Sequence, residues 1–163
     1  MEGSLFQYFK TEKKESIYYI VLGLLSVVFT IYFLSKGHRF YNGISYALIS
    51  VGLIELVVGA TIYLSSDKDI VRVDHFIHKD FYSIKNVEIP RMQSQLKNLE
   101  IYLIADKIFI ILGLILLFSS APFSLVKGIG IGITIQSMML FLLDHRTEQR
   151  SKAYFTFLNS LIA

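Results

Sequence analysis

The sequence predicts an all-α, polytopic membrane protein, and three observations lead to this fold class. Of the 163 residues, 53% are hydrophobic and only 18% are charged, whereas charged residues make up about 25% of an ordinary soluble domain. The mean hydropathy is +0.53. The apolar residues also gather in four long runs, and a helix that crosses a hydrocarbon core of about 30 Å needs roughly 20 of them. We therefore expect four transmembrane helices in a single membrane domain, residues 1–163.

The four runs are expected to form two helical hairpins. They cover about residues 17–35, 44–64, 101–118 and 123–143. The sequence KGHRFYNG joins the first two runs and SSAP joins the last two, and connections this short join antiparallel neighbours. A weak internal repeat also pairs NGISYALISVG in the second span with KGIGIGITIQS in the fourth. The repeat predicts a pseudo-twofold axis along the membrane normal between the hairpins.

Basic residues are divided unequally between the two sides of the expected bundle. Twelve Lys and Arg residues lie in the N-terminal segment, the loop 65–100 and the tail 144–163, whereas three lie near helix ends on the other side. Segments rich in Lys and Arg that flank membrane spans stay in the cytoplasm. Both termini, the loop and the tail are therefore expected to be cytoplasmic.

The loop and the tail show apolar residues at helical spacing outside the spans. They are Ile70, Val73, Ile77 and Phe81 in the loop, and Tyr154, Leu158 and Leu161 in the tail. Amphipathic helices of this kind lie in the membrane interface, so we expect interfacial helices at the cytoplasmic side. A short strand at DIVRVDHF is the alternative for the loop. Pro90 suits the first turn of a helix that continues into the third span.

Small residues line one face of each expected span. Such residues let helix backbones approach closely in lipid, where packing rather than the hydrophobic effect holds helices together. We therefore expect these faces to lie against other helices. The predicted packing residues are Gly23, Gly52, Gly59, Gly113, Gly128 and Gly132.

Polar side chains lie inside the expected spans at similar depths. Glu55 is on the glycine face of the second span, within the run GLIELVVG. The depth of each residue is counted from the cytoplasmic end of its span at about 1.5 Å per residue. By this count, the other spans place polar residues at a depth similar to that of Glu55. The predicted layer consists of Glu55, Asp106, Lys107, Gln136 and Ser26. We expect the Lys107 ammonium group to reach Glu55.

This polar layer has two interpretations. A charge near the bilayer centre costs about 2.5 to 3.5 kcal/mol, so charged residues there normally pair with one another or face water. In the first interpretation the layer is a satisfied hydrogen-bond network that fixes the register of the helices. In the second it lines a site for a proton, an ion or a small polar ligand. The sequence leaves both open.

The sequence contains no pattern of an enzyme or of a metal centre. There is no cysteine, which excludes thiol chemistry, and no nucleophile motif or P-loop. His75 and His78, with Asp74 and Asp80, lack a recognised metal-ligand spacing. The net charge of +3 is explained by lipid headgroups and topology. We expect a protein that is not an enzyme, with no metal, no cofactor and no nucleic-acid partner.

Three segments, VGLIELVVG, EIPRMQSQLKNLEIY and residues 128–158 from GIGIGITIQS into the tail, carry a resemblance to a family. Together they resemble an uncharacterised family of small four-helix bacterial inner-membrane proteins. The resemblance implies the four-span fold and a location in the bacterial inner membrane. It implies no activity.

Three functions can be compared with these patterns. A membrane enzyme or lipid-binding module is disfavoured, because the layer offers one lysine and no arginine for a phosphate headgroup. Two functions remain. The first, which we expect, is a non-enzymatic helix bundle that acts through protein–protein interaction, as an accessory, assembly or immunity-type protein; its partners are the lipid bilayer and either a second copy or another membrane protein. The second is an oligomeric ion or proton channel or transporter that uses the layer of Glu55, Asp106 and Lys107.

Overall fold

A computed structural model describes residues 2–79 and 81–162, and the side-chain surroundings of residues 7–78 and 82–161. Four long helices dominate: α1 (Glu2–Leu34), α2 (Arg39–Lys79), α4 (Ile89–Ser119) and α5 (Leu125–Ile162). Between α2 and α4 lie the short helix α3 (Phe81–Ser83) and the π-helix η1 (Ile84–Glu88). No strand occurs in the described ranges, so the all-α prediction is confirmed and the strand alternative at DIVRVDHF is wrong.

Each long helix is long enough and apolar enough to cross a membrane. In the most apolar window of each helix, only 17% to 33% of the residues are buried inside the bundle, so most apolar side chains point outward. A soluble protein rarely exposes apolar surface of this extent. Such a surface is normally covered by lipid or by another protein. The fold and its surface are those of a multi-pass membrane protein.

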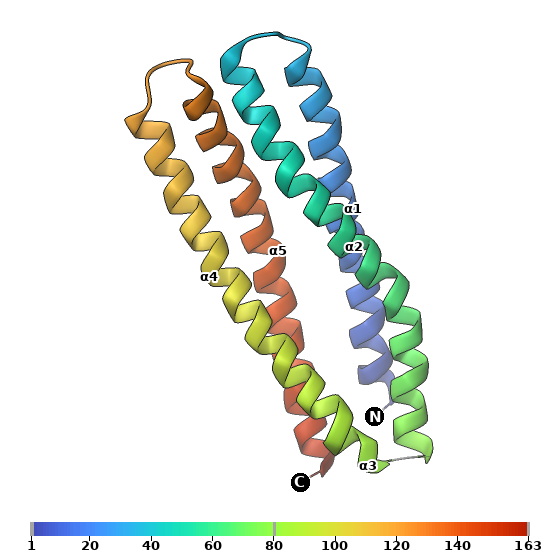
Figure 1. Cartoon of the computed structure of the whole chain (residues 1–163). Helices are drawn as coiled ribbons and strands as arrows, with labels where there is room; N and C mark the ends of the chain where they lie inside the picture. The colour runs from blue at the N-terminus through green and yellow to red at the C-terminus, as the bar shows by residue number, and fades with distance from the viewer. Residues whose placement is uncertain (1, 80, 163) are drawn as a thin grey trace.

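The helices pack side by side along their lengths. Helix α1 lies along α2, and α4 lies along α5 (Figure 1). Contacts between α2 and α5 join these two helix pairs. The two short connections, α1 to α2 and α4 to α5, lie at one end, which we name the loop end. Both chain ends and α3 lie at the other, the terminal end (Figure 1).

Helices α2 and α5 continue far beyond the expected spans. Helix α2 has 41 residues, or about 61 Å at 1.5 Å per residue, which is twice the thickness of a hydrocarbon core of about 30 Å. Residues 65–79 of the loop and the tail, which the sequence predicts as interfacial helices, are instead extensions of α2 and α5, whereas the predicted helix from Pro90 into the third span is confirmed in α4.

The extensions are held together by a hydrophobic cluster, which we name the terminal core. Its members are Tyr8, Phe9, Val73, Ile84, Met92, Tyr154 and Leu158. Burial of a large apolar side chain contributes about 1.5–3 kcal/mol. The apolar residues that recur at helical spacing outside the spans therefore pack against other helices of the bundle. This packing is the physical reason for the difference from the expected interfacial helices.

The contact between α2 and α5 depends on two glycines at equivalent positions of the internal repeat. A Cβ atom at Gly43 would meet the backbone of Leu125 and Ile129, and one at Gly128 would meet the backbone of Phe40 and Ile44. The contacts are reciprocal, as the predicted pseudo-twofold relation requires. Gly43 is a packing residue that the sequence analysis missed.

The structure places the predicted packing glycines against neighbouring helices of the same chain. A Cβ atom at Gly52 would lie 2.5 Å from the Ser26 Cβ atom, and one at Gly59 would lie 2.9 Å from the backbone nitrogen of Ile20. Gly113 faces Thr134 in the same way. Similar contacts are made by Gly23, Gly128 and Gly132. The small-residue faces are therefore occupied within one bundle.

Candidate functional site

The middle of the bundle contains a buried layer formed by α1, α2 and α5. The Gln136 Nε2 atom donates hydrogen bonds to Glu55 Oε2 at 2.7 Å and to Ser26 Oγ at 3.0 Å. The three residues are 1% to 3% exposed. The Glu55 Oε1 atom is buried and has no hydrogen-bond partner. The structure thus brings together three of the five residues of the predicted polar layer.

The other two members of the predicted layer lie elsewhere. Asp106 on α4 is 6% exposed, and Lys107 is exposed, with its Nζ atom 5.7 Å from the centre of the Phe141 ring. Among the described residues, no ion pair links Lys107 to Glu55 or to Asp106. Consecutive residues of a helix point in different directions, so only one of the two can face inward. The structure therefore does not supply the expected counter-charge for Glu55.

Asp106 belongs to a second polar layer, nearer the terminal end. The Tyr19 hydroxyl donates a hydrogen bond to Asp144 Oδ1 at 2.6 Å, and Asp106 lies close enough to Asp144 for an electrostatic interaction. The Asp106 Oδ2 atom is buried without a hydrogen-bond partner. Carboxyl groups from α4 and α5 thus both belong to this layer.

A cavity of about 210 Å³ lies beside this second layer, between the four long helices. Its polar lining includes Glu12, Glu15, Tyr19, Gln95, Asp144 and Arg150. We name it the acidic cavity, because three carboxyl groups line it and a single guanidinium group accompanies them. It lies on the terminal side of Glu55, since Val58 and Ile62, on the same face of α2, line it.

The cation in the lining is already engaged by a carboxylate. The Arg150 Nη1 atom forms an ion pair with Glu15 Oε2. Among the described residues, neither Glu55, Asp106 nor Asp144 takes part in an ion pair. The interior of the bundle therefore contains carboxyl groups in excess of basic ones, in surroundings where an unpaired charge is costly.

A further buried carboxylate, Glu88 in η1, is fully paired and is best explained as structural. Its side chain is 0% exposed. Arg91 donates to both of its oxygens, at 2.6 and 3.1 Å, and the Tyr154 hydroxyl donates to Oε1 at 3.2 Å. Arg72 of α2 lies 3.5 Å from Oε2. Glu88 thus connects α2, η1, α4 and α5 at the terminal end and leaves no oxygen for a ligand.

The Thr30 and Ser45 hydroxyls in the loop half of the bundle are satisfied by the backbone, whereas the buried Asn42 Oδ1 atom has no hydrogen-bond partner. The hydroxyls of Thr30 and Ser45 each donate to the carbonyl oxygen of the other residue, at 3.4 and 3.3 Å. Together with the close contacts of Gly43 and Gly128, these bonds bring the backbones of α1, α2 and α5 together. Among the described residues, the buried carboxyl oxygens without a partner belong to Glu55 and Asp106, so we place the candidate site in the middle and the terminal half of the interior.

The histidine pair considered for metal binding lies in the extension of α2. His78 Nδ1 is 3.4 Å from Asp74 Oδ1, while Asp80 lies outside the described residues. Within the described part of the chain, no group of three or more His, Asp or Glu side chains is arranged to hold a metal ion.

Sequence reasoning missed Tyr19, Asp144 and Arg150, although helical spacing carries a signal for the first two. Tyr19 precedes Ser26 by seven residues and Asp144 follows Gln136 by eight, and both spacings return close to the same helix face. The apolar run of the fourth span ends at residue 143, so the sequence places Asp144 in the predicted tail.

The fold defines the class: an all-α protein with four helices that are long and apolar enough to span a membrane, and with a cavity between them. Comparison with models of known families, with curated proteins and with solved structures gave no match. The family resemblance of the sequence therefore stays an expectation, and function is argued from the site alone.

Proposed function

We propose that the protein binds a cation at the carboxyl groups of its interior and carries it across a membrane. One observation carries this proposal: Glu55 and Asp106 are buried, Asp144 is half-buried, and none of the three has an ion-pair partner among the described residues. A proton or a positively charged solute would supply the missing partner. The acidic cavity, about 210 Å³ in volume, offers room for a small solute beside one of these groups, Asp144.

This proposal follows the second of the two functions expected from the sequence. The first, protein–protein interaction, was favoured by the glycine faces and by the amphipathic extensions. In the structure, the glycines contact helices of the same chain, and apolar residues of the extensions form the terminal core. Both features are thus explained by packing within one chain, and neither favours protein–protein interaction over the other functions. Crosslinking in mild detergent remains the test of that function.

We assign the terminal end to the cytoplasm and the protein to a bacterial inner membrane. The excess of Lys and Arg in the segments at this end supports the orientation, and the family resemblance supports the location. In this orientation the acidic cavity lies in the cytoplasmic half of the bundle. Because the four long helices of one chain line the cavity, the proposal needs no oligomer.

Flux into liposomes tests the proposal. The purified protein is reconstituted, and a gradient is applied in three separate arms: protons, a monovalent metal ion, and a small organic amine. We expect flux above that of protein-free liposomes in at least one arm, and a loss of about tenfold in Glu55→Gln, equivalent to about 1.4 kcal/mol. Glu100→Gln, an exposed carboxylate on α4, is the control. Equal flux in wild type and Glu55→Gln in every arm contradicts the proposal.

A further inference from the structure

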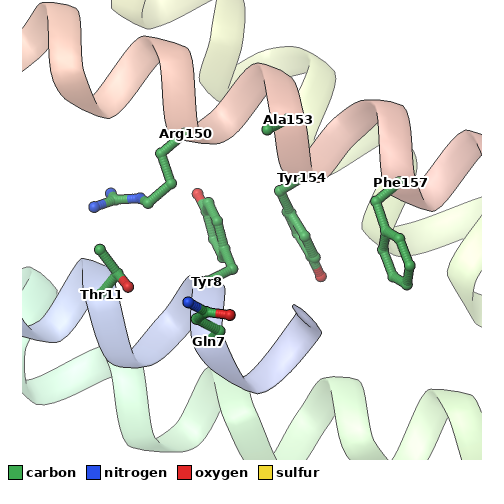
Figure 2. A pocket seen from close by; sticks show the side chains of 7 residues that line it. All are labelled: Gln7, Tyr8, Thr11, Arg150, Ala153, Tyr154 and Phe157. Atoms are coloured by element: carbon green, nitrogen blue, oxygen red, sulfur yellow. The ribbon is translucent and has the colours of Figure 1, made fainter. Parts of the chain in front are cut away.

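A groove between α1 and α5 lies at the terminal end of the bundle, next to the acidic cavity. It has a volume of about 280 Å³. Gln7, Tyr8 and Thr11 of α1 line one side of it, and Arg150, Tyr154 and Phe157 of α5 line the other (Figure 2). The rings of Tyr8 and Tyr154 are stacked, with their centres 4.2 Å apart. The groove is open to the surroundings and rich in aromatic side chains.

Arg150 lines both the groove and the acidic cavity, and so stands between them. Its guanidinium group forms an ion pair with Glu15 and lies 5.2 Å from the centre of the Tyr8 ring. A carboxylate and an aromatic face are the two groups that bind an organic cation most effectively in proteins. Arg150 therefore already occupies, with its own side chain, a place suited to such a cation.

We propose that this place is the entrance to the acidic cavity, and that Arg150 is a tethered cation which an incoming organic cation displaces. The inference rests on the proposed function, and it names the solute class as a small ammonium or guanidinium compound. Displacement exchanges one cation for another at Glu15 and Tyr8, so neither group is left unpaired. Beyond the entrance the solute meets Asp144, which lines the acidic cavity.

The packing of the helices allows this exchange. Helix α1 packs mainly on α2, and α5 packs mainly on α4 and α2, so few backbone contacts join α1 to α5. The Arg150 and Glu15 side chains are 13% and 23% exposed, so solvent already reaches the ion pair. Arg150 can leave the entrance by a change of its own rotamer, without separation of the tightly packed helix pairs.

The chain has no cysteine, so a single introduced thiol reports access to the cavity without interference. Thr147 lines the acidic cavity, three residues before Arg150 on α5, and Thr147→Cys is the reporter. Its reaction rates with a cationic and an anionic methanethiosulfonate of similar size are measured in detergent. They are divided by the rates of Gln149→Cys, an exposed position on the same helix. Acidic clefts concentrate cations by about tenfold or more, so we expect a cationic preference of that size.

Variants of the ion pair then separate a tethered cation from a merely structural contact. In Arg150→Gln we expect the cationic reagent to react about tenfold faster and the cationic preference to grow, because a positive charge leaves the entrance. In Glu15→Gln we expect the preference to fall, since Arg150 then lacks its counter-charge. Arg150→Lys should keep both rates within about twofold of the reporter background, because the charge is retained. Arg146→Gln, which removes an exposed arginine of the same helix, is the matched control.

Equal acceleration of both reagents in Arg150→Gln, or rates equal to those of Arg146→Gln, would overturn the inference. Equal acceleration would indicate a loosened bundle, and unchanged rates would indicate that Arg150 does not control access. Labelling requires no transport, so a protein that shows charge-selective labelling and no liposome flux contradicts the proposed carrier function but not the entrance. Flux with charge-independent labelling contradicts the entrance alone.

Discussion

Replacement of Gln136 by leucine tests whether the mid-span layer is a hydrogen-bonded unit. The Gln136 amide supplies the hydrogen bond to Glu55 Oε2 at 2.7 Å and one to Ser26 at 3.0 Å. Glu55 is 1% exposed, and its other oxygen already has no partner. In Gln136→Leu, both oxygens of the carboxyl group are therefore buried without a donor. Ser26 keeps its bond to the Leu22 carbonyl oxygen, so the main loss falls on Glu55.

The expected size of the effect follows from these contacts. A buried polar group that loses its partner costs about 1–3 kcal/mol, and interhelical hydrogen bonds in membranes are worth about 0.6 to 2 kcal/mol. We expect Gln136→Leu to lower the free energy of unfolding by about 2 kcal/mol. In a Glu55→Leu background the same change should cost under about 0.5 kcal/mol, because two apolar side chains then face each other.

The measurement is a double-mutant cycle of unfolding in mixed micelles. Titration with a denaturing detergent is followed by near-ultraviolet circular dichroism of the tyrosines, since the chain has 10 tyrosines and no tryptophan. A coupling energy of about 1.5 kcal/mol would agree with the hydrogen bond. If the two substitutions add to within about 0.3–0.5 kcal/mol, as independent sites do, the bond between Gln136 and Glu55 does not exist.

Three further predictions address the rest of the bundle. Gly128→Val should abolish the folded, monodisperse state in size-exclusion chromatography, because its side chain would enter the backbone of α2 at Phe40; Gly37→Asn, at a turn with φ +64 and open space, should not. Glu88→Gln should lower the free energy of unfolding by about 1–3 kcal/mol, since Arg91 loses a charged acceptor; an unchanged detergent midpoint would contradict its structural role. Lys107→Gln should change stability by under about 0.5 kcal/mol, as for an exposed side chain; a larger loss would restore Lys107 as an interior counter-charge.

The membrane-crossing part of the fold was predictable because its signal is local. A run of about 20 apolar residues has few alternatives to a spanning helix, and short connections such as SSAP leave only antiparallel neighbours. The extensions were not predictable in the same way. The spacing of Val73 and Leu158 fits a helix on a membrane surface equally well, and only contacts between distant segments, such as Tyr8 with Tyr154, decide between the two.

The same distinction separates the predicted part of the site from the missed part. Glu55, Gln136 and Ser26 share glycine-lined faces within apolar runs, so the sequence brings them together. Lys107 was included on depth alone, although depth does not determine the direction in which a side chain points. Asp144 and Arg150 were missed because each lies in an amphipathic stretch with many charges, where the inward-facing ones look the same in sequence as the solvated ones.

The positions of the polar groups along the bundle constrain how a carrier of this fold would work. The unpaired carboxyl groups are at Glu55 and toward the terminal end, while the hydroxyls of Thr30 and Ser45 in the loop half are bonded to backbone carbonyls. A cation bound at Glu55 therefore meets a closed contact between α2 and α5 at Gly43 and Gly128. Because the backbones of α2 and α5 touch at this contact, release at the loop end requires these two helices to separate there. The glycine contact is thus the part of the structure that has to differ between the two states of the proposed carrier.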